Sequence, residues 1–578
     1  MRYGRLIAAL LLFVLCRGTL LAQVLTSRPH IGVEQVPIGE DVYAFLRHLS
    51  VRGTIEGYSE TELPLTEYEV SQFLEQARGS TLSSSESELL QKYLRTYAHK
   101  PREAVTMFPA REAEPLFWGG IPTDKDKYLY RWFDDSTQSD LFVHAVGSID
   151  IRRKTEPDPA SVGLLTVGGR FSGTLTGRVG YYMQTTNGER VGDAALALED
   201  PILGRNNDLR YFSKQFFDFT SAELAYDNDW FTAKLAREQA GIGGGFQSDN
   251  ILLSPSVPFL DFLSLSAHAE AVRYQAMLAS LVDDTITEPA PALPVKYLAL
   301  HDLTIQTSHN VEFGFTDIMV FAQRLDLGYL NPFSFLGTVK HQLNQQDQDN
   351  SLLGAHARWR LAPGIELRGQ ALLDDLVASK IGTGYWGNKW AWQFGAMWAG
   401  AFGMHDLDWE MEWIRVDPYT YTHWDPHTQY SSSQTILGAQ IGPNAQSLWS
   451  MLRWVPSAKW TAAFEGQFVQ RGENVFDTVG TLLYNAGSDY TLGMSKEGQE
   501  NQTYFLNGRR VNILTLTATL SFEPWRGLVV FARGTKKGVD YLNEAPVTPG
   551  IDLGGRSVSL APRELPETLV AFGVRALF

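Results

Sequence analysis

The residues best suited to chemistry in this chain are charged side chains that occupy every second position of apolar segments. Asp408, Glu410 and Glu412, for example, alternate with large apolar residues. Side chains two positions apart lie on the same face of a β-strand. Carboxylates stacked in this way are costly in a dry protein core but inexpensive against enclosed water. The spacing therefore predicts strands with one face toward water and the other toward an apolar environment.

The same alternation predicts a larger set of charged side chains that line a lumen. This set comprises Arg178, Arg358, Arg360, Glu366, Arg368, Asp408, Glu410, Glu412, Arg453 and Glu465. Such a set could create a transverse field in a pore, form an ion-pair network that closes the lumen, or bind a charged polysaccharide. Three of the arginines, Arg358, Arg360 and Arg368, lie close to Glu366 on a predicted hairpin, so the charges partly neutralise one another. These arginines alone therefore do not predict a purely anion-selective channel.

Sequence patterns typical of enzymes are missing. There is no Gly-x-Ser-x-Gly or His-Glu-x-x-His motif, the histidines are scattered singly, and no cysteine ligand set exists. Asp374 and Asp375 are adjacent on a predicted strand, so they point to opposite sides, unlike the carboxylate pair of a glycosidase. A triad assembled from distant strands, as in a barrel lipase or protease, remains an alternative. We expect no enzymatic activity, no cofactor and no metal.

The elements that must position these residues are about eighteen strands after residue 140. Period-two alternation is clearest in residues 141–152, 351–361, 365–373, 390–398, 407–413 and 568–578. A closed antiparallel barrel in an outer membrane explains this pattern better than a soluble all-β protein does, because its lumen is wet and its outer surface meets lipid. The aromatic residue that ends the last segment resembles the signal read by barrel assembly machinery.

The predicted connections are alternately short and long. Tight turns are expected near residues 172–173, 227–229, 308–310, 362–364, 403–406, 456–459 and 524–527, and long gaps near 187–216, 238–260, 323–350, 417–445, 472–510 and 536–567. Outer-membrane barrels have short periplasmic turns and long external loops. We therefore expect an even number of strands, with both chain termini in the periplasm. The segments between residues 260 and 281 are short, so the count there could differ by two.

The N-terminus and the composition indicate export. Arg2 and Arg5 precede an apolar stretch at residues 6–16, and a small residue, Ala22, precedes Gln23, which predicts a signal peptide over residues 1–22. Cys16, the only cysteine, would be removed with it. The formal charge of -16 would then become about -19, and such an acidic chain is unsuited to nucleic acid. No apolar run is long enough for a helical membrane span.

Residues 23–110 are predicted to form a small helical module, followed by a connector at 111–140 and the barrel at 141–578. Val42, Phe45, Leu46 and Leu49 repeat at helical spacing. Two predicted capping boxes, Thr66 with Glu69 and Ser83 with Glu86, mark the starts of two further helices. The sequence of residues 36–69 resembles an S-layer homology segment, a module that can contact cell-wall polymers. A helical cap on the periplasmic mouth without any ligand is the alternative.

Motifs along the barrel resemble the Wzi-type capsule assembly family. They are Arg237-Glu238, the glycines of 241–245, Leu252-Leu253-Ser254, Pro258, the stretches 297–301 and 329–332, Arg415 with 418–421, Leu437-Gly438 and residues 442–445. The resemblance implies a barrel of about eighteen strands, with a helical bundle at its periplasmic end, that helps to hold surface polysaccharide. Gly241-Ile242-Gly243 departs from the family, in which we expect a Trp-Gly-Pro-like element.

Candidates for polysaccharide binding at the external rim are Arg237, Glu238, Arg415, Tyr419, Tyr421 and Trp424. Arg237 interrupts an apolar face, which suggests a bulge or the end of a strand, and it could clamp a sugar acid or pair with a carboxylate. The aromatic residues could stack on sugar rings or belong to an interfacial girdle. The glycines of 241–245 lack the context of a phosphate-binding loop, so they are expected to allow a sharp or closely packed loop.

Two functions follow as hypotheses. The first is a non-enzymatic outer-membrane barrel that supports assembly or attachment of capsular or exopolysaccharide. The second is a diffusion porin for small polar solutes. The expected partners are outer-membrane lipid, surface polysaccharide and, during biogenesis, the barrel assembly machinery.

Overall fold

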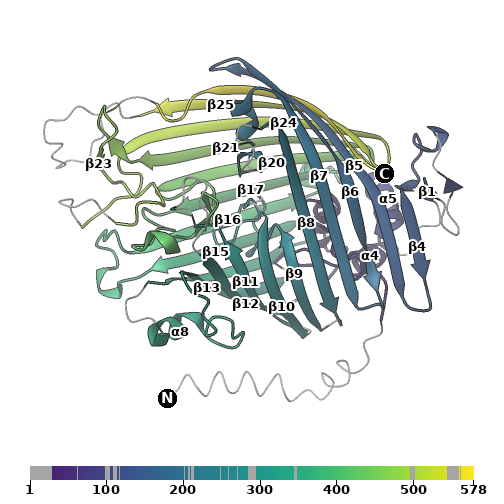
Figure 1. Cartoon of the computed structure of the whole chain (residues 1–578), viewed down its shortest axis with the longest axis horizontal. Coiled ribbons are helices and arrows are strands. Elements are labelled where there is room, and N and C mark those ends of the chain that lie inside the picture. Colours follow the sequence, from purple (N-terminus) through teal and green to yellow (C-terminus); the bar gives the residue numbers. More distant parts are fainter. Residues whose placement is uncertain are drawn as a thin grey trace.

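In the computed structural model, the chain forms one large closed antiparallel barrel (Figure 1). The structure describes residues 29–542 and 559–578, apart from 62, 98–103, 109–113, 116–117, 201, 206–208, 210–213, 229, 248, 258, 270, 284, 286–294, 344–347, 495–500 and 560–561. The predicted signal peptide and Pro258 therefore lie outside the described residues. No helix of the described part is long and apolar enough to cross a membrane.

Eighteen strands close the barrel in the described part of the chain, which confirms the predicted fold. They are β5 (Ser139–Glu156), β6 (Ala160–Leu175), β7 (Val179–Gly192), β8 (Phe216–Asp227), β9 (Phe231–Glu238), β10 (Leu260–Ala269), β11 (Val272–Leu281), β12 (Lys296–Ser308), β13 (Val311–Ala322), β14 (Asn350–Ala362), β15 (Ile365–Asp375), β16 (Lys389–Ala399), β17 (Leu407–Val416), β20 (Ala445–Ser457), β21 (Trp460–Glu473), β24 (Arg509–Trp525), β25 (Leu528–Tyr541) and β26 (Glu567–Leu577). The segments between residues 260 and 281 form two strands, so the count holds there.

The barrel closes where β26 pairs with β5, and the short strand β4 (Tyr130–Asp134) pairs with the remaining part of β5. Seven other short strands of the described part lie outside the barrel wall. Three of them, β1 (Ala104–Thr106), β2 (Glu114–Pro115) and β3 (Asp126–Tyr128), form one small sheet. Among the loops, β18 (Ser431–Ser432) pairs with β19 (Thr435–Ile436), and β22 (Val475–Phe476) with β23 (Leu482–Tyr484). The last residue, Phe578, exchanges backbone hydrogen bonds with Ala145, so the C-terminus is part of the seam.

Period-two alternation places apolar side chains outside and polar ones inside, as predicted. On β24, for instance, Leu514, Leu516 and Leu520 are 45%, 38% and 48% exposed on the outer surface. On β17, Glu410 and Glu412 are buried inside the barrel. The outer surface is therefore apolar, and the charged side chains are enclosed.

The connections alternate as predicted, with two differences. The expected turn at residues 172–173 is wrong, because β6 continues to Leu175 and the turn lies at 176–178. Gly173 instead permits close approach of two backbones, since a Cβ atom there would lie 2.4 Å from the carbonyl oxygen of Asp140. In addition, only residues 157–159 join β5 to β6, although this connection lies at the end of the barrel that carries the long loops.

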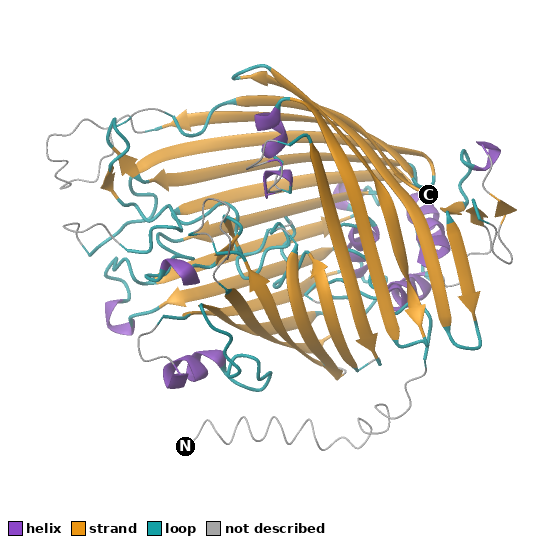
Figure 2. Cartoon of the chain, in the orientation of Figure 1, coloured by secondary structure: helices purple, strands orange, loops and turns teal. Residues whose placement is uncertain are grey.

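Three helices occupy the end of the barrel with the short turns (Figure 2). They are α3 (Val42–Val51), α4 (Glu67–Ala77) and α5 (Ser84–Tyr97), and we call residues 29–97 the helical module. Both predicted capping boxes are confirmed: Glu69 N donates to Thr66 Oγ1 (3.1 Å) and Glu86 N donates to Ser83 Oγ (3.2 Å), with the reciprocal bonds also present. The apolar residues predicted for the first helix, Val42, Phe45, Leu46 and Leu49, are all buried.

The remaining helices are short. The loops at the opposite end carry α6 (Ala194–Leu198) and α8 (Leu336–Leu343), and single 3-10 turns are η1 (Trp118–Gly120), η2 (Leu203–Arg205), η3 (Ala378–Lys380), η4 (Ala401–Gly403) and η5 (Pro426–Thr428). α3 lies against β16 and α5 lies against β20. The fold thus combines a barrel with material packed inside both of its ends.

Candidate functional site

The helical module is held in the barrel by a network of buried ion pairs. Arg47 of α3 contacts Glu60 (2.8 Å) in the module and Glu410 (2.9 Å) on β17. Glu60 in turn contacts Arg368 (2.7 Å) on β15, and Arg368 contacts Glu366 (2.7 Å). Arg47 and Arg368 therefore both lie between carboxylates of the module and of the wall, and the network connects the two.

The charges of this network are fixed by their surroundings. Burial alone would raise the pKa of Glu60, but Arg47 and Arg368 outweigh it and lower that pKa to about 2. Burial would lower the pKa of His48, but the carboxylates of Asp408 (2.7 Å) and Glu86 (2.9 Å) raise it to about 9. At neutral pH Glu60 is therefore ionised and His48 is protonated, so opposite charges meet across the interface.

Backbone groups complete the contact between module and wall. Arg360 of β14 donates to the carbonyl oxygens of Ser50 and His309, each at 2.6 Å. Gly364 N, in the turn after β14, donates to Val51 O (2.9 Å). Arg358 lies 3.6 Å from Glu312 and 3.7 Å from Glu366. The arginines of this hairpin thus bind the module and the wall rather than face an open pore.

Two long loops fold inward from the opposite end of the barrel. Loop 239–259 reaches the inner wall, where Phe246 N donates to Glu412 (2.8 Å) and Gly244 O accepts from Arg368 (2.7 Å). The glycines permit this approach, as expected, because a Cβ atom on Gly245 would lie 2.5 Å from Gln393 Nε2. Glu412 therefore binds loop backbone. The glycine-rich turn serves packing against the wall.

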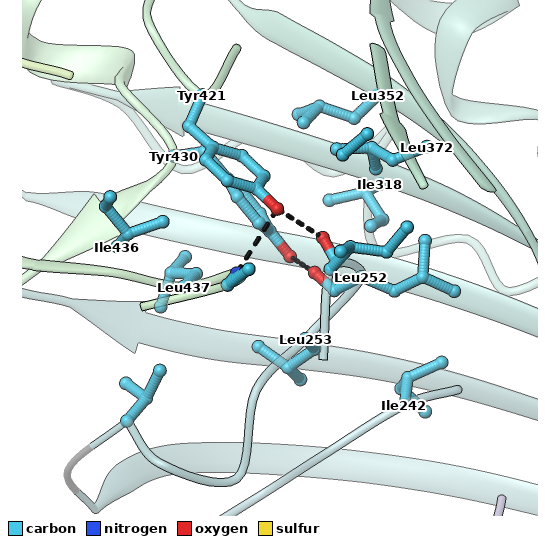
Figure 3. Packing of buried hydrophobic residues seen from close by; sticks show 14 of the residues in the cluster. Ile242, Leu252, Leu253, Ile318, Leu352, Leu372, Tyr421, Tyr430, Ile436 and Leu437 are labelled. Atoms are coloured by element: carbon cyan, nitrogen blue, oxygen red, sulfur yellow. Dashed lines mark hydrogen bonds between the residues drawn. The ribbon is translucent and has the colours of Figure 1, made fainter. Parts of the chain in front are cut away.

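Loop 417–444 covers loop 239–259 (Figure 3). Tyr421 Oη donates to Ile251 O (3.0 Å), and Tyr430 Oη donates to Leu252 O. Asp249 accepts from Gln440 N (2.9 Å), and burial raises the pKa of Asp249 to about 7. Apolar residues of both loops share one buried cluster with strand residues: Ile242, Ile251, Leu252, Leu253, Leu437, Ile318, Leu352 and Leu372. The two loops and the module together fill the lumen beside β9 to β17.

The remaining lumen candidates differ in position. Arg453 and Glu465 lie on the inner faces of β20 and β21 and are partly exposed; Arg453 is the register partner of Asp408. Arg178 is not on a lumen-facing strand position, because it lies in the turn between β6 and β7. The shift follows from β6, which extends beyond the turn predicted at 172–173 and displaces the turn to Arg178.

At the rim, the structure changes the interpretation of several residues. Arg237 does not mark a bulge: it stays in register at the end of β9 and pairs with Asp261 (2.6 Å) on the outer surface. Glu238 points inward and binds Lys234 (2.7 Å). Tyr419 and Tyr421 are completely buried, so neither ring has a free face for stacking on a sugar. Their burial follows from the inward folding of loop 417–444.

Arg415 and Trp424 are accessible. Arg415 pairs with Asp417 (2.7 Å) and lies 3.8 Å above the ring of Phe505. It borders a cavity of about 250 Å³ whose other lining residues include Tyr385, Asn388, Trp390 and Tyr504. Trp424 is 49% exposed. No group of three or more metal-ligating side chains occurs among the described residues.

The partners of the lumen charges could not be predicted from the sequence pattern. These partners are Arg47, His48, Glu60 and Glu86 of the helical module, of which only Glu86 had a predicted role, as a helix cap. One signal was available. Arg47 and His48 lie between apolar residues of a helix that is predicted to be buried, and both side chains are indeed largely buried in the structure.

Comparison with solved structures decides the fold. Wzi of Escherichia coli, an outer-membrane protein involved in group 1 capsule assembly and described as a carbohydrate-binding β-barrel, superposes with a TM-score of 0.56. The match covers 94% of this chain and 99% of Wzi, at 12% sequence identity. The chain has the fold of Wzi. The resemblance noted in the sequence motifs is thereby confirmed for the fold.

Other comparisons add little. OprD of Pseudomonas aeruginosa covers 76% of this chain with a TM-score of 0.41 and 8% identity, and OccAB4 of Acinetobacter baumannii covers 76% with 0.42 and 7%. No protein-family model matches the sequence, and neither does any curated protein. The chain is an outer-membrane β-barrel by its fold, and its specific role requires a separate argument.

Proposed function

We propose that this protein is a non-enzymatic outer-membrane barrel that supports the assembly or attachment of capsular or exopolysaccharide at the cell surface. One observation carries the proposal: the lumen beside β9 to β17 is filled from both ends, by the ion-paired helical module and by loops 239–259 and 417–444. A diffusion porin needs a water-filled path for solutes, whereas a scaffold does not.

The fold shared with Wzi supports the same proposal, since Wzi is described as carbohydrate-binding and involved in capsule assembly. In this proposal the short turns, both termini and the helical module lie in the periplasm, and the long loops lie outside the cell. The barrel assembly machinery inserts the chain through its C-terminal strand. Arg415 and Trp424 remain candidates for sugar contacts at the external rim, because both are accessible there.

The test is to delete the chain and measure cell-bound and released polysaccharide separately. We expect total polysaccharide to be retained and its cell-bound share to fall, with recovery when the wild-type chain is supplied. The matched control is a strain that carries Glu75→Gln, which removes an exposed ion pair of α4 and should leave the cell-bound share at the wild-type level. An unchanged cell-bound share after deletion would contradict the proposal.

A further inference from the structure

The inner wall of the barrel has two unlike halves. On β9 to β17, most inward polar side chains are buried beneath the module and the loops: Ser264 is 3% exposed, Glu312 1% and Gln393 1%. Ser266 and Gln275, near the short-turn end of β10 and β11, are partly exposed exceptions. On β5, β6, β21, β24 and β25, inward polar side chains remain partly exposed. We call the latter set the hydroxyl wall, and it comprises Ser148, Thr166, Glu465, Gln467, Thr515, Thr517, Thr519 and Thr535.

Strand register arranges the hydroxyl wall in two patches, one on β21, β24 and β25 and one on β5 and β6, with β26 between them. Thr517 of β24 lies opposite Glu465 of β21 and Thr535 of β25. Hydroxyls of neighbouring strands meet, with Thr517 to Thr535 at 3.2 Å and Ser148 to Thr166 at 2.6 Å. Because strands rise about 3.4 Å per residue, the hydroxyls from Thr515 to Thr519 extend over roughly 14 Å of β24.

A cavity of about 480 Å³ lies at the long-loop end of the same region. Its lining includes Arg152, Lys154, Lys537 and Glu567 from the inner faces of β5, β25 and β26, and Glu199 after α6. Lys154 pairs with Glu199 (2.5 Å) and Glu567 (3.3 Å), so the charges there are balanced rather than purely cationic. Cavities of this size accommodate small organic ligands.

The opposite end of the hydroxyl wall is braced by α5. Lys92 of α5 contacts Glu523 (2.5 Å), which follows Thr519 on β24. Glu88 of α5 accepts a hydrogen bond from Ala458 N (3.2 Å), in the turn before β21. Arg526, in the turn after β24, pairs with Asp126 (2.8 Å). These contacts narrow the short-turn end, where a cavity of about 440 Å³ remains between α5 and the turns.

We propose that the hydroxyl wall and this cavity form a vestibule that receives a segment of a polar glycan chain from the long-loop side. Threonine and serine hydroxyls and the amide of Gln467 can exchange hydrogen bonds with sugar hydroxyls as both donors and acceptors. The paired charges at the mouth add donors and acceptors without selecting for anions. The identity of the glycan as surface polysaccharide rests on the proposed function.

Cysteine accessibility tests the vestibule in the full-length protein. The sequence contains one cysteine, Cys16, so a Cys16→Ser background makes each introduced thiol unique. Thr517→Cys probes the hydroxyl wall, Leu516→Cys is its lipid-facing neighbour, and Ser264→Cys is an inward but buried control. The probe is a charged, water-soluble methanethiosulfonate reagent applied to protein in liposomes, with heat-modifiable gel mobility as the folding control.

We expect Thr517→Cys to react at least about tenfold faster than both controls, since thiol reactivity follows exposure to water. A Thr517→Cys rate equal to that of Ser264→Cys would overturn the vestibule itself. The second measurement adds polysaccharide purified from the surface of wild-type cells before the reagent. Slower labelling of Thr517→Cys by at least about fivefold supports glycan entry, because an occupied wall excludes the reagent.

Labelling that polysaccharide leaves unchanged would overturn glycan entry. This failure is distinguishable from failure of the proposed function: if deletion of the chain still releases polysaccharide, the scaffold role stands and glycan entry is wrong. If deletion changes nothing while Thr517→Cys is protected, glycan entry stands and the scaffold role is wrong.

Discussion

Neutralising Glu60 should release the helical module from the barrel wall. The Glu60 carboxylate is buried and contacts both Arg47 and Arg368, and its low pKa keeps it ionised at neutral pH. Glu60→Gln preserves the shape of the side chain but leaves two buried guanidinium groups short of one partner. Removing one member of a buried ion pair costs about 3–5 kcal/mol. We expect about 3 kcal/mol, the lower end, because Arg47 keeps Glu410 and Arg368 keeps Glu366.

Hydrogen exchange of the amides of α3, α4 and α5 in detergent measures this effect. A loss of about 3 kcal/mol corresponds to roughly a hundredfold fall in protection, since every 1.4 kcal/mol is tenfold. The matched control is Glu75→Gln, which removes a carboxylate of α4 that is 43% exposed and pairs with Arg78 (3.1 Å). An exposed pair contributes at most about 1 kcal/mol, so protection should change less than about fivefold. Equal protection in Glu60→Gln and Glu75→Gln would refute the role of the network.

Two further predictions concern pH and the loops. Because the folded pKa of His48 (about 9) lies above its ordinary value of 6.5, its stabilisation of the module is complete below pH 6.5 and is lost as pH rises through 9. Exchange in α3, corrected for its intrinsic pH dependence, should therefore accelerate between pH 6 and 10 in the wild type but not in His48→Gln; the same acceleration in both would count against the His48 contacts. Leu252→Ala should weaken the packing between loops 239–259 and 417–444 by about 2–5 kcal/mol. On whole cells, chymotrypsin, which cleaves after aromatic residues, should then cut these loops at sites such as Phe246 and Tyr430, whereas lipid-facing Leu516→Ala should leave them uncut. Resistance equal to that of the wild type would show that the cluster does not hold the loops.

The strands were predictable from the sequence because each residue faces one of two solvents. Glu366 and Arg368 point into the barrel while Leu367 points outward, because side chains of a strand alternate between only two faces. The capping boxes at Thr66 and Ser83 were predictable for a similar reason, since their hydrogen bonds join residues three apart. Local rules were sufficient for both kinds of element.

The contents of the lumen were not predictable in this way. Phe246 binds Glu412 across 166 residues of sequence, and Arg47 binds Glu410 across 363. Neither separation leaves a local pattern. Tyr419 and Tyr421 illustrate the consequence, because aromatic residues in a long loop look the same in sequence whether the loop extends outward or folds into the barrel. Partner assignment therefore required the three-dimensional structure.

Single-channel recording of the purified full-length protein tests the central claim most directly, namely that packed helices and loops make this barrel a scaffold rather than a diffusion pore. The network at Glu60 and the loop cluster at Leu252 both belong to the packing that occupies the lumen. We predict no large, steady conductance in planar bilayers. A large and steady conductance from correctly folded protein would contradict the account and favour a porin.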